Sequence, residues 1–168
     1  MPLLEIIGVT PVGKNFNVAV AFMRNESEEH YCWVLNNLRR LFAESVVPST
    51  IVTDRELGLM KALDQIFPDS YHLLCRFHIN KNVELMATRE MGRNKGYGIN
   101  FSRRVWKKLI DSLTVAEYDT NLAEIQWEFQ RFPNLLNYLN ETWLVYKERF
   151  VRAWTDRVFH LGNRTTNR

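Results

Sequence analysis

The feature that most constrains the fold is a change of periodicity near residue 77. Before it, short runs of β-branched and aliphatic residues alternate with segments whose apolar residues repeat at helical spacing, whereas after it only helical spacing remains. The order strand, strand, helix, strand, helix, strand predicts two antiparallel strands followed by a right-handed, parallel β-α-β unit. The chain is therefore predicted to be α/β, with a mixed sheet in its first half and an all-helical second half.

Local signals place the individual elements. Ser27 is a typical N-cap for a helix, and Thr114 together with Glu117 fits a capping box. Pro133 suits the first turn of a later helix. The strands are predicted over residues 3–10, 16–23, 50–53 and 71–74, with a turn at residues 11–15 between the first two.

Length and composition restrict the class of protein. A chain of 168 residues, of which 46% are hydrophobic, fits one folded domain or one domain with a large insertion. Two cysteines form no disulfide framework, and neither a secretory signal nor an 18-residue apolar run is present, so we expect an intracellular protein without a membrane partner. Four of the five tryptophans lie in the second half, where helical spacing favours a core over a base-stacking surface.

The positive charge is concentrated in one segment. Counting Lys and Arg against Asp and Glu, residues 1–75 carry −3, residues 76–110 carry +7 and residues 111–168 carry −1. Such a block is suited to phosphate contacts, because neutralised phosphates release counterions; a solvated helix face is the alternative interpretation. The candidate DNA-binding residues are Arg76, Lys81, Arg93, Lys95, Arg103, Arg104, Lys107 and Lys108.

Asp54 is the first candidate for chemistry, because it directly follows the β-branched run at residues 50–53. A carboxylate at the carboxyl end of a buried strand points into the crevice where open α/β sheets bind their ligands. The alternative is that Asp54 only caps a helix over residues 55–67, with Glu56 helping to cap or forming a salt bridge. A single carboxylate is not a metal site.

Cys75 and His78 are three residues apart, which puts them on one face if Arg76 begins a helix. This is half of a zinc site. A complete site needs two more ligands, and although His30, Cys32 and His72 are candidates, no second closely spaced pair exists. A Cys-His nucleophile pair would need an orienting third group, which the sequence does not indicate.

Three segments, residues 2–10, 51–56 and 75–83, closely resemble the transposase domain of plant Mutator-like elements when taken in this order and spacing. The resemblance extends over nearly the whole chain and includes the far-red-response transcription regulators of plants, which are similar to Mutator transposases. It implies a ribonuclease-H-like mixed sheet interrupted by an all-helical insertion. It also implies an Asp-Asp-Glu triad that binds Mg²⁺ or Mn²⁺ and acts on double-stranded DNA at transposon ends in the nucleus.

By the same resemblance, Asp54 matches the second Asp of the triad, which would be both catalytic and a metal ligand. Cys75 and His78 match the family's C-x-x-H motif, whose implied role is to position the site or the DNA. The implied domains are a partial ribonuclease-H-like core at residues 1–88, a helical insertion at residues 89–155, and at residues 156–168 the run-up to the helix with the catalytic Glu.

The chain departs from the family at both ends. By resemblance, the first Asp belongs to a central strand before Met1, and the Glu to a helix that begins just beyond Arg168. With one ligand of three, no Mg²⁺ or Mn²⁺ is expected to bind tightly. Without the central strand, the strands at residues 3–10 and 50–53 either close on each other or expose unpaired backbone edges.

Three functional hypotheses follow. The leading one is a fragment of a Mutator-like transposase, inactive alone, so whether the chain is an enzyme is uncertain. The alternative is a domesticated DNA-binding or transcription-regulator module without catalysis, and the third is a decayed reading frame with no selected function. Because transposases act as multimers on paired ends, a homo-oligomer is among the expected partners.

Overall fold

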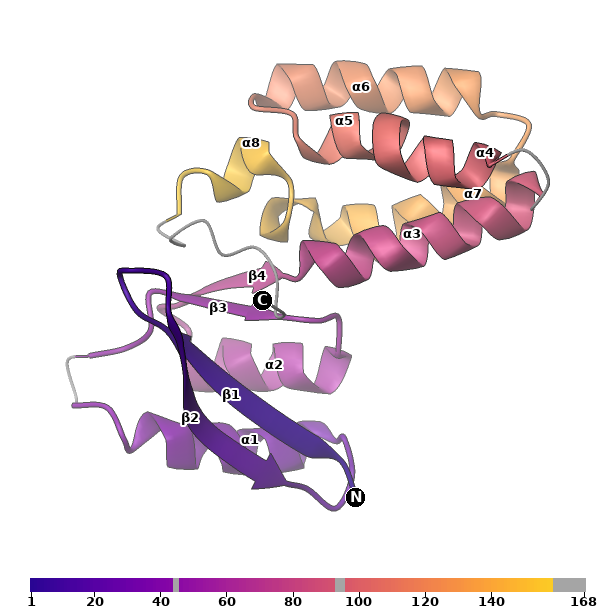
Figure 1. Ribbon diagram of the computed structural model, residues 1–168. Helices are drawn as coiled ribbons and strands as arrows, with labels where there is room; N and C mark the ends of the chain where they lie inside the picture. Colours follow the sequence, from indigo (N-terminus) through magenta and orange to yellow (C-terminus); the bar gives the residue numbers. More distant parts are fainter. Residues whose placement is uncertain (44–45, 93–95, 159–168) are drawn as a thin grey trace. The chain divides into compact units, whose positions relative to one another are not determined.

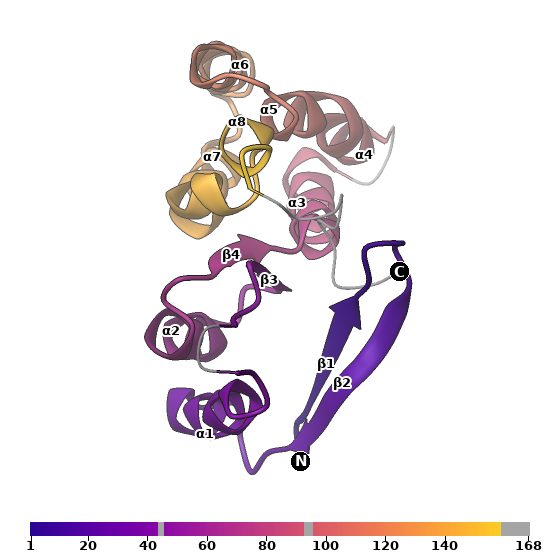
Figure 2. The ribbon, with the colours of Figure 1, turned by 90° about the vertical axis from the view of Figure 1, so that its left-hand side faces the viewer.

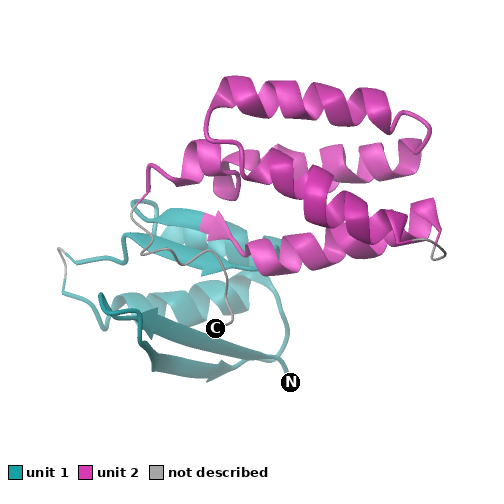
Figure 3. Ribbon diagram, turned by 45° about the horizontal axis from the view of Figure 1, so that its top comes forward, with its two compact units in different colours: residues 1–72, 159–163 teal, residues 73–158, 164–168 magenta. Residues whose placement is uncertain are grey.

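The structure is a computed structural model that describes residues 1–43, 46–92 and 96–158. The described chain divides into two compact units, residues 1–72 and residues 73–158 (Figure 3). The first unit, unit 1, contains strands and helices, whereas unit 2 is almost entirely helical. The predicted α/β class and the helical second half are both confirmed.

Unit 1 follows the predicted element order (Figure 1). Each strand begins and ends within one residue of its predicted bounds, because the β-branched runs and the turn residues between them are clear local signals. The last strand, β4, begins in unit 1 and ends in unit 2. The elements are β1 (Leu3–Val9), β2 (Asn15–Phe22), α1 (Glu28–Arg39), β3 (Thr50–Thr53), α2 (Leu57–Ile66) and β4 (Tyr71–Leu74).

β1 and β2 form the predicted antiparallel hairpin. In the turn between β1 and β2, the Gly13 amide donates to the Thr10 carbonyl at 2.8 Å. Gly13 has a φ of 73°, a conformation that favours glycine. The register shifts between Ile6 and Ile7, so that β2 has one extra residue, Val18. This bulge leaves both Val18 and Ala19 half-buried and bends the hairpin locally.

Helices α1 and α2 supply the core of unit 1 and cover one face of the hairpin (Figure 2). Ser27 caps α1 as predicted, since its hydroxyl accepts from the His30 amide at 3.4 Å. Strands β1, β2 and β3 each add half-buried side chains to this core. The buried residues are Met23, Tyr31, Val34, Leu35, Leu38, Leu59, Ala62, Leu63 and Phe67, and the strand residues include Leu4, Ile6, Val18, Ala21 and Ile51.

The predicted single mixed sheet is not formed. The described strands make two separate sheets of two strands each, β1 with β2 and β3 with β4. In Figure 2, β1 is the strand of the hairpin nearer to β3, yet no described strand joins them by hydrogen bonds. A sheet continues only where neighbouring backbones lie about 4.8 Å apart. From the sequence, β1 and β3 are expected either to pair with each other or to keep unpaired backbone edges. The structure shows the second arrangement among the described strands.

Unit 2 is built from helical segments (Figure 1). Thr114 and Glu117 form the predicted cap, because the Thr114 hydroxyl accepts from the Glu117 amide at 3.1 Å while the Glu117 carboxylate accepts from the Leu113 amide at 2.7 Å. Pro133 begins its helix as predicted. The segments are α3 (Arg76–Met91), α4 (Tyr97–Asn100), the π-helical η1 (Phe101–Trp106), α5 (Lys107–Ile110), α6 (Val115–Glu128), α7 (Pro133–Tyr138), the π-helical η2 (Leu139–Trp143), the 3₁₀-helical η3 (Leu144–Arg149) and α8 (Arg152–Thr155).

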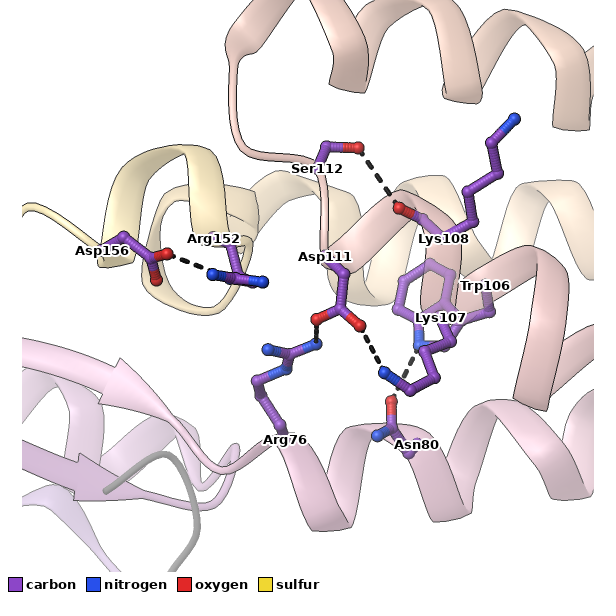
Figure 4. Close-up of polar contacts among 9 residues, drawn as sticks. All are labelled: Arg76, Asn80, Trp106, Lys107, Lys108, Asp111, Ser112, Arg152 and Asp156. Atoms are coloured by element: carbon purple, nitrogen blue, oxygen red, sulfur yellow. Dashed lines mark hydrogen bonds and ion pairs between the residues drawn. The ribbon is translucent and has the colours of Figure 1, made fainter. Parts of the chain in front are cut away.

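Aromatic side chains dominate the core of unit 2. Trp106 is fully buried, and its indole nitrogen donates to Asn80 Oδ1 at 3.1 Å (Figure 4). A glycine allows α4 to pack close to α3, because a Cβ at Gly98 would lie 2.3 Å from the backbone nitrogen of Thr88. The assignment of the tryptophans to the core is right for Trp106 but wrong for Trp127, which is 76% exposed.

None of the described helices has the length and apolarity needed to cross a bilayer. This finding concerns residues 1–43, 46–92 and 96–158. The predicted run-up to the catalytic-Glu helix, at residues 156–168, falls outside the described residues except for its first three positions.

Candidate functional site

Asp54 lies where the sequence analysis expects it, directly after β3. Its side chain is exposed. The N-cap of α2 is Glu56, whose carboxylate accepts from the Gly58 amide at 3.2 Å. The interpretation of Asp54 as the cap of this helix is therefore wrong, because Glu56 occupies that position. Asp54 keeps its carboxylate available at the strand end.

Three carboxylates act on the Tyr31 hydroxyl, a grouping that no motif in the sequence predicts. Burial is the largest cause, and together with the negative charges of Glu26, Glu56 and Asp54 it raises the pKa of Tyr31 to about 12. Glu26 precedes α1, while Glu56 and Asp54 belong to the loop between β3 and α2. The Tyr31 phenol is therefore neutral at ordinary pH, and three acidic residues from two segments act on it.

These acids do not form a cation site by themselves. No three His, Cys, Asp or Glu side chains within the described part of the chain converge closely enough to hold a metal ion. Glu56 is already engaged in capping α2. A hard divalent cation needs several converging oxygen ligands, and Asp54 contributes one carboxylate. The donors described here therefore do not fit Mg²⁺ or Mn²⁺ without further ligands.

Cys75 and His78 flank the start of α3, which begins at Arg76 as the sequence spacing requires. Cys75 is the N-cap residue and is fully buried. His78 is half-buried, with its ring edge-on to Phe77 at 5.5 Å between centroids. Its Nδ1 atom is buried and has no hydrogen-bond partner within the described residues. Such a ring nitrogen needs a polar partner from outside this set of residues.

The residues considered as further zinc ligands are engaged in separate local contacts of unit 1. His30 Nδ1 lies 2.6 Å from the Ser27 hydroxyl, and Cys32 donates to Gln65 at 3.5 Å. His72 contacts Asp64 at 2.7 Å and the Phe67 carbonyl at 3.1 Å. His72, a residue of β4, is therefore held by these two contacts and not by a ligand cluster. A structural zinc site is therefore not assembled by the described side chains.

Arg76 takes part in an ion network with Asp111 and Lys107 (Figure 4). Each cation approaches a different oxygen of the Asp111 carboxylate, at 2.5 Å in both cases. Burial alone would raise the pKa of Asp111, but the hydrogen bonds and charges of Lys107 and Arg76 outweigh it and hold that pKa below its usual value. Arg76 is thus mainly a structural cation that ties α3 to α5.

Other basic candidates lie on the exposed side of η1 and α5. Arg103, Arg104, Lys107 and Lys108 occupy positions one and four residues apart, which places them on one helix face. Arg103 is 3.7 Å from Glu84, and Lys108 is 2.7 Å from Glu124. Arg104 has no carboxylate partner among the described residues. We call these four residues the basic face.

Two of the candidate DNA-binding residues, Arg93 and Lys95, lie outside the described residues. Lys81 is exposed on α3 and has no carboxylate partner within the described chain. The basic segment is therefore not one uniform surface. Arg76 is committed to Asp111, whereas the cations of the basic face remain mostly exposed, with 73% of the Arg103 side chain and 64% of the Lys107 side chain accessible.

Comparison with known proteins finds a family match in the first half of the chain. Residues 1–82 match the MULE transposase domain. This match covers the first 82 of the 168 residues. The match includes the hairpin, β3 with Asp54, and the Cys75 and His78 pair. This match agrees with the resemblance to Mutator-like transposases, which rests on residues 2–10, 51–56 and 75–83.

Relatives of the MULE transposase segment include plant and fungal proteins. Protein FAR-RED IMPAIRED RESPONSE 1 of Arabidopsis thaliana is 22% identical over 172 residues, covering 100% of this chain and 19% of the relative. Protein FAR1-RELATED SEQUENCE 6 of the same plant is 28% identical over 152 residues, covering 89% and 20%. The PKS-NRPS hybrid synthetase cheA of Chaetomium globosum is 32% identical over 92 residues, covering 54% and 2%.

The chain corresponds to only a small part of these relatives. It spans about a fifth of the length of the two plant proteins and 2% of the fungal synthetase. Similarity to the plant proteins continues through unit 2, since the alignments cover 100% and 89% of this chain. The MULE-type segment and the helical unit therefore occur together in these plant relatives.

Proposed function

We propose that this chain is a segment of a Mutator-like transposase whose intact parent cleaves DNA and transfers strands at transposon ends. The observation that carries this proposal is the match of residues 1–82 to the MULE transposase domain, with Asp54 at the end of β3. An exposed carboxylate at a strand end is the type of residue that a nuclease uses to hold a divalent cation. In the parent, Mg²⁺ or Mn²⁺ would supply Lewis-acid stabilisation of the phosphate.

The parent is proposed to have a ribonuclease-H-like core at residues 1–88, a helical insertion at residues 89–155 and the run-up to the catalytic-Glu helix at residues 156–168. The open edges of β1 and β3 support this arrangement, because one further strand between them would join the two sheets. Such a strand would also place its own terminal side chain beside Asp54. Cys75 and His78 would position the site or the DNA.

The 168-residue chain is proposed to be inactive alone. Asp54 is a single carboxylate, and the nearby acid Glu56 is engaged with the Gly58 amide. Phosphoryl transfer at a two-metal site requires several carboxylates around ions about 3.5–4 Å apart. Whether the natural polypeptide is an active enzyme therefore depends on residues beyond this segment. Action on DNA would place the parent in the nucleus.

The test compares the chain with a longer polypeptide that contains it. The genomic sequence on both sides is translated and searched for an Asp on a strand and a Glu on a helix, and the extended protein is assayed for Mg²⁺- and Mn²⁺-dependent cleavage of transposon-end duplexes. We expect no cleavage by the 168-residue chain and cleavage by the extended protein.

A matched pair of variants assigns the role of the strand-end acid. Asp54→Asn in the extended protein is expected to abolish cleavage, whereas Asp69→Asn, which removes another exposed carboxylate of unit 1, is expected to leave it unchanged. Cleavage by the short chain, or an active Asp54→Asn protein, contradicts the proposal. Flanking sequence without either acid in any frame contradicts it as well.

We infer as a second candidate a DNA-binding or transcription-regulator module that performs no catalysis. The observation that favours it is the basic face, whose cations point to solvent along η1 and α5. Binding to duplex DNA should weaken with salt, with a slope of about −0.9 in log affinity for each phosphate neutralised. Arg104→Glu should reduce the magnitude of this slope, while Arg24→Glu in unit 1 should not. If the chain does not bind duplex DNA, or binds it with an affinity that does not depend on salt, this second proposal is contradicted.

A further inference from the structure

The hairpin of unit 1 is apolar on both faces. One face packs on α1 and α2 through side chains such as Leu4 and Ile6. The opposite face, here called the outer face, is formed by Leu3, Glu5 and Ile7 of β1 with Val20 and Phe22 of β2. The register pairs Leu3 with Phe22 and Glu5 with Val20, so these side chains adjoin one another.

The outer face is uncovered in the described structure. Its apolar members are 56% exposed at Leu3, 43% at Ile7, 48% at Val20 and 65% at Phe22. A contiguous apolar patch of this kind is a sign of an interaction surface, because water contact with so many neighbouring apolar groups is unfavourable. An occupant must therefore present a matching apolar surface.

The charge at the centre of the patch restricts the occupant further. Glu5 is exposed between Leu3 and Ile7, and no cation pairs with it among the described residues. Covering this carboxylate without a partner would cost free energy, because a buried charge needs a compensating one. The complementary surface should therefore carry one cation flanked by apolar side chains.

Helix α3 offers this pattern. Phe77, Lys81 and Leu85 are four residues apart and so lie along one face of the helix. Phe77 is 50% exposed and Leu85 is 61% exposed, although both are large apolar side chains. Lys81 lies between them, is exposed, and has no carboxylate partner in the part of the chain that is described. We call these three residues the α3 stripe.

The two surfaces match in spacing as well as in charge. Four helical residues advance by about 6 Å, and two strand residues advance by about 6.7 Å. The order apolar, charged, apolar therefore repeats at nearly the same interval on the α3 stripe and along β1. A helix with its side chains is about 10–12 Å wide, which is enough to cover two strands about 4.8 Å apart.

We propose that the outer face of the hairpin in one copy of this chain binds the α3 stripe of a second copy, with Lys81 paired to Glu5. Phe77 and Leu85 then cover the apolar side chains on either side of Glu5. This assignment makes Lys81 a protein contact and leaves the basic face to phosphates.

The first test is charge reversal, read by light scattering of the full chain over a range of concentrations. The wild-type mass is expected to rise from 19.9 kDa towards twice that value or more. Glu5→Lys and Lys81→Glu should each weaken self-association by about tenfold or more, because each places like charges opposite one another. The double variant should restore it. Lys14→Glu, an exposed reversal in the hairpin turn, is the control and should change nothing.

Mixing distinguishes contact between copies from contact within one copy. At a concentration where the wild type associates, the Glu5→Lys and Lys81→Glu chains should each associate about tenfold more weakly, whereas an equimolar mixture should associate like the wild type, because each contact between the two variants joins opposite charges. Association of the wild type that is insensitive to both reversals overturns the proposal. A wild-type chain that stays monomeric at all concentrations overturns it too, as does a mixture that fails to associate.

Removing apolar surface gives an independent check. Phe22→Ser and Leu85→Ser should each weaken association, since each removes an exposed side chain from one of the two surfaces. Trp127→Ser removes a side chain that is 76% exposed but lies on α6, outside both surfaces, and should have no effect. Because all three positions are exposed, circular dichroism should show unchanged folding. Equal effects of all three variants would contradict the assignment of surfaces.

Discussion

The two units differ in how their backbone groups form hydrogen bonds and in how their apolar side chains are buried. In unit 2 the backbone hydrogen bonds lie within helices, and its largest aromatic side chain in the core, Trp106, is fully enclosed. In unit 1 the helices α1 and α2 enclose one cluster, but β1 and β3 each keep one edge that pairs with no described strand. A helical segment completes its hydrogen bonds locally, while a strand depends on a neighbour.

The largest expected effect tests whether the two cores are separate. Trp106→Ala should destabilise unit 2 by about 3–5 kcal/mol, because it opens a cavity and leaves Asn80 without its indole partner. Hydrogen exchange should accelerate in α3 and α5 more than in α1 and α2. Uniform acceleration in both units would show that the two cores unfold together.

The counterpart in unit 1 is Leu63→Ala, which removes a side chain that is 1% exposed from the cluster between α1 and α2. We expect a loss of about 2–5 kcal/mol, with faster exchange in α1 and α2. Trp127→Ala, on the exposed side of α6, is the control for both and should change the free energy of unfolding by less than about 0.5 kcal/mol. Urea unfolding measures all three.

A smaller effect is expected from Asp111→Asn in unit 2. The substitution leaves Arg76 and Lys107 close together without their shared carboxylate. We expect a loss of about 1–2 kcal/mol, since the network is partly exposed and therefore partly screened. An unchanged free energy of unfolding would show that the ion network does not stabilise unit 2.

The same carboxylate gives a prediction for pH. The pKa of Asp111 is lowered in the folded chain, so its contribution to stability is present above the unfolded value near 3.8 and is lost as pH falls through the folded pKa. Urea unfolding at about pH 6 and about pH 3 should therefore show a larger loss for the wild type than for Asp111→Asn. An equal loss in both proteins would contradict the lowered pKa.

The smallest effects compare one helix cap in each unit. Thr114→Ala should cost about 1 kcal/mol, because the Thr114 hydroxyl and the Glu117 carboxylate satisfy amides at the start of α6. Ser27→Ala in unit 1 should cost less, about 0.5 kcal/mol, since its bond to the His30 amide is 3.4 Å long. A larger loss at Ser27 would reverse this ranking.

Much of the secondary structure could be predicted from sequence because its signals are local. The strand bounds at residues 3–9 and 71–74 follow from β-branched runs, and the caps at Ser27 and Thr114 follow from side chains that bond within a few residues. Trp127 was misplaced, because helical spacing identifies a stripe but does not say which surface covers it.

The candidate site was only partly predictable. The position of Asp54 at a strand end follows from the pattern around it, but the choice of Glu56 as the cap depends on where the first turn of α2 begins. The grouping of Glu26 with Glu56 and Asp54 around Tyr31 joins residues distant in sequence. No local signal indicates such a grouping, because it depends on how α1 packs beside the β3–α2 loop.

The sequence alone indicates the order of the elements, the turn and cap residues, and the similarity of residues 1–82 to the MULE transposase domain, since these depend on side chains close together along the chain. The tertiary structure shows that the strands form two sheets, that Arg76 and Lys107 share the Asp111 carboxylate, and that the outer face of the hairpin is uncovered in the described part of the chain. The physical reason is that hydrogen bonding between strands, ion pairing and burial are properties of residues brought together in space.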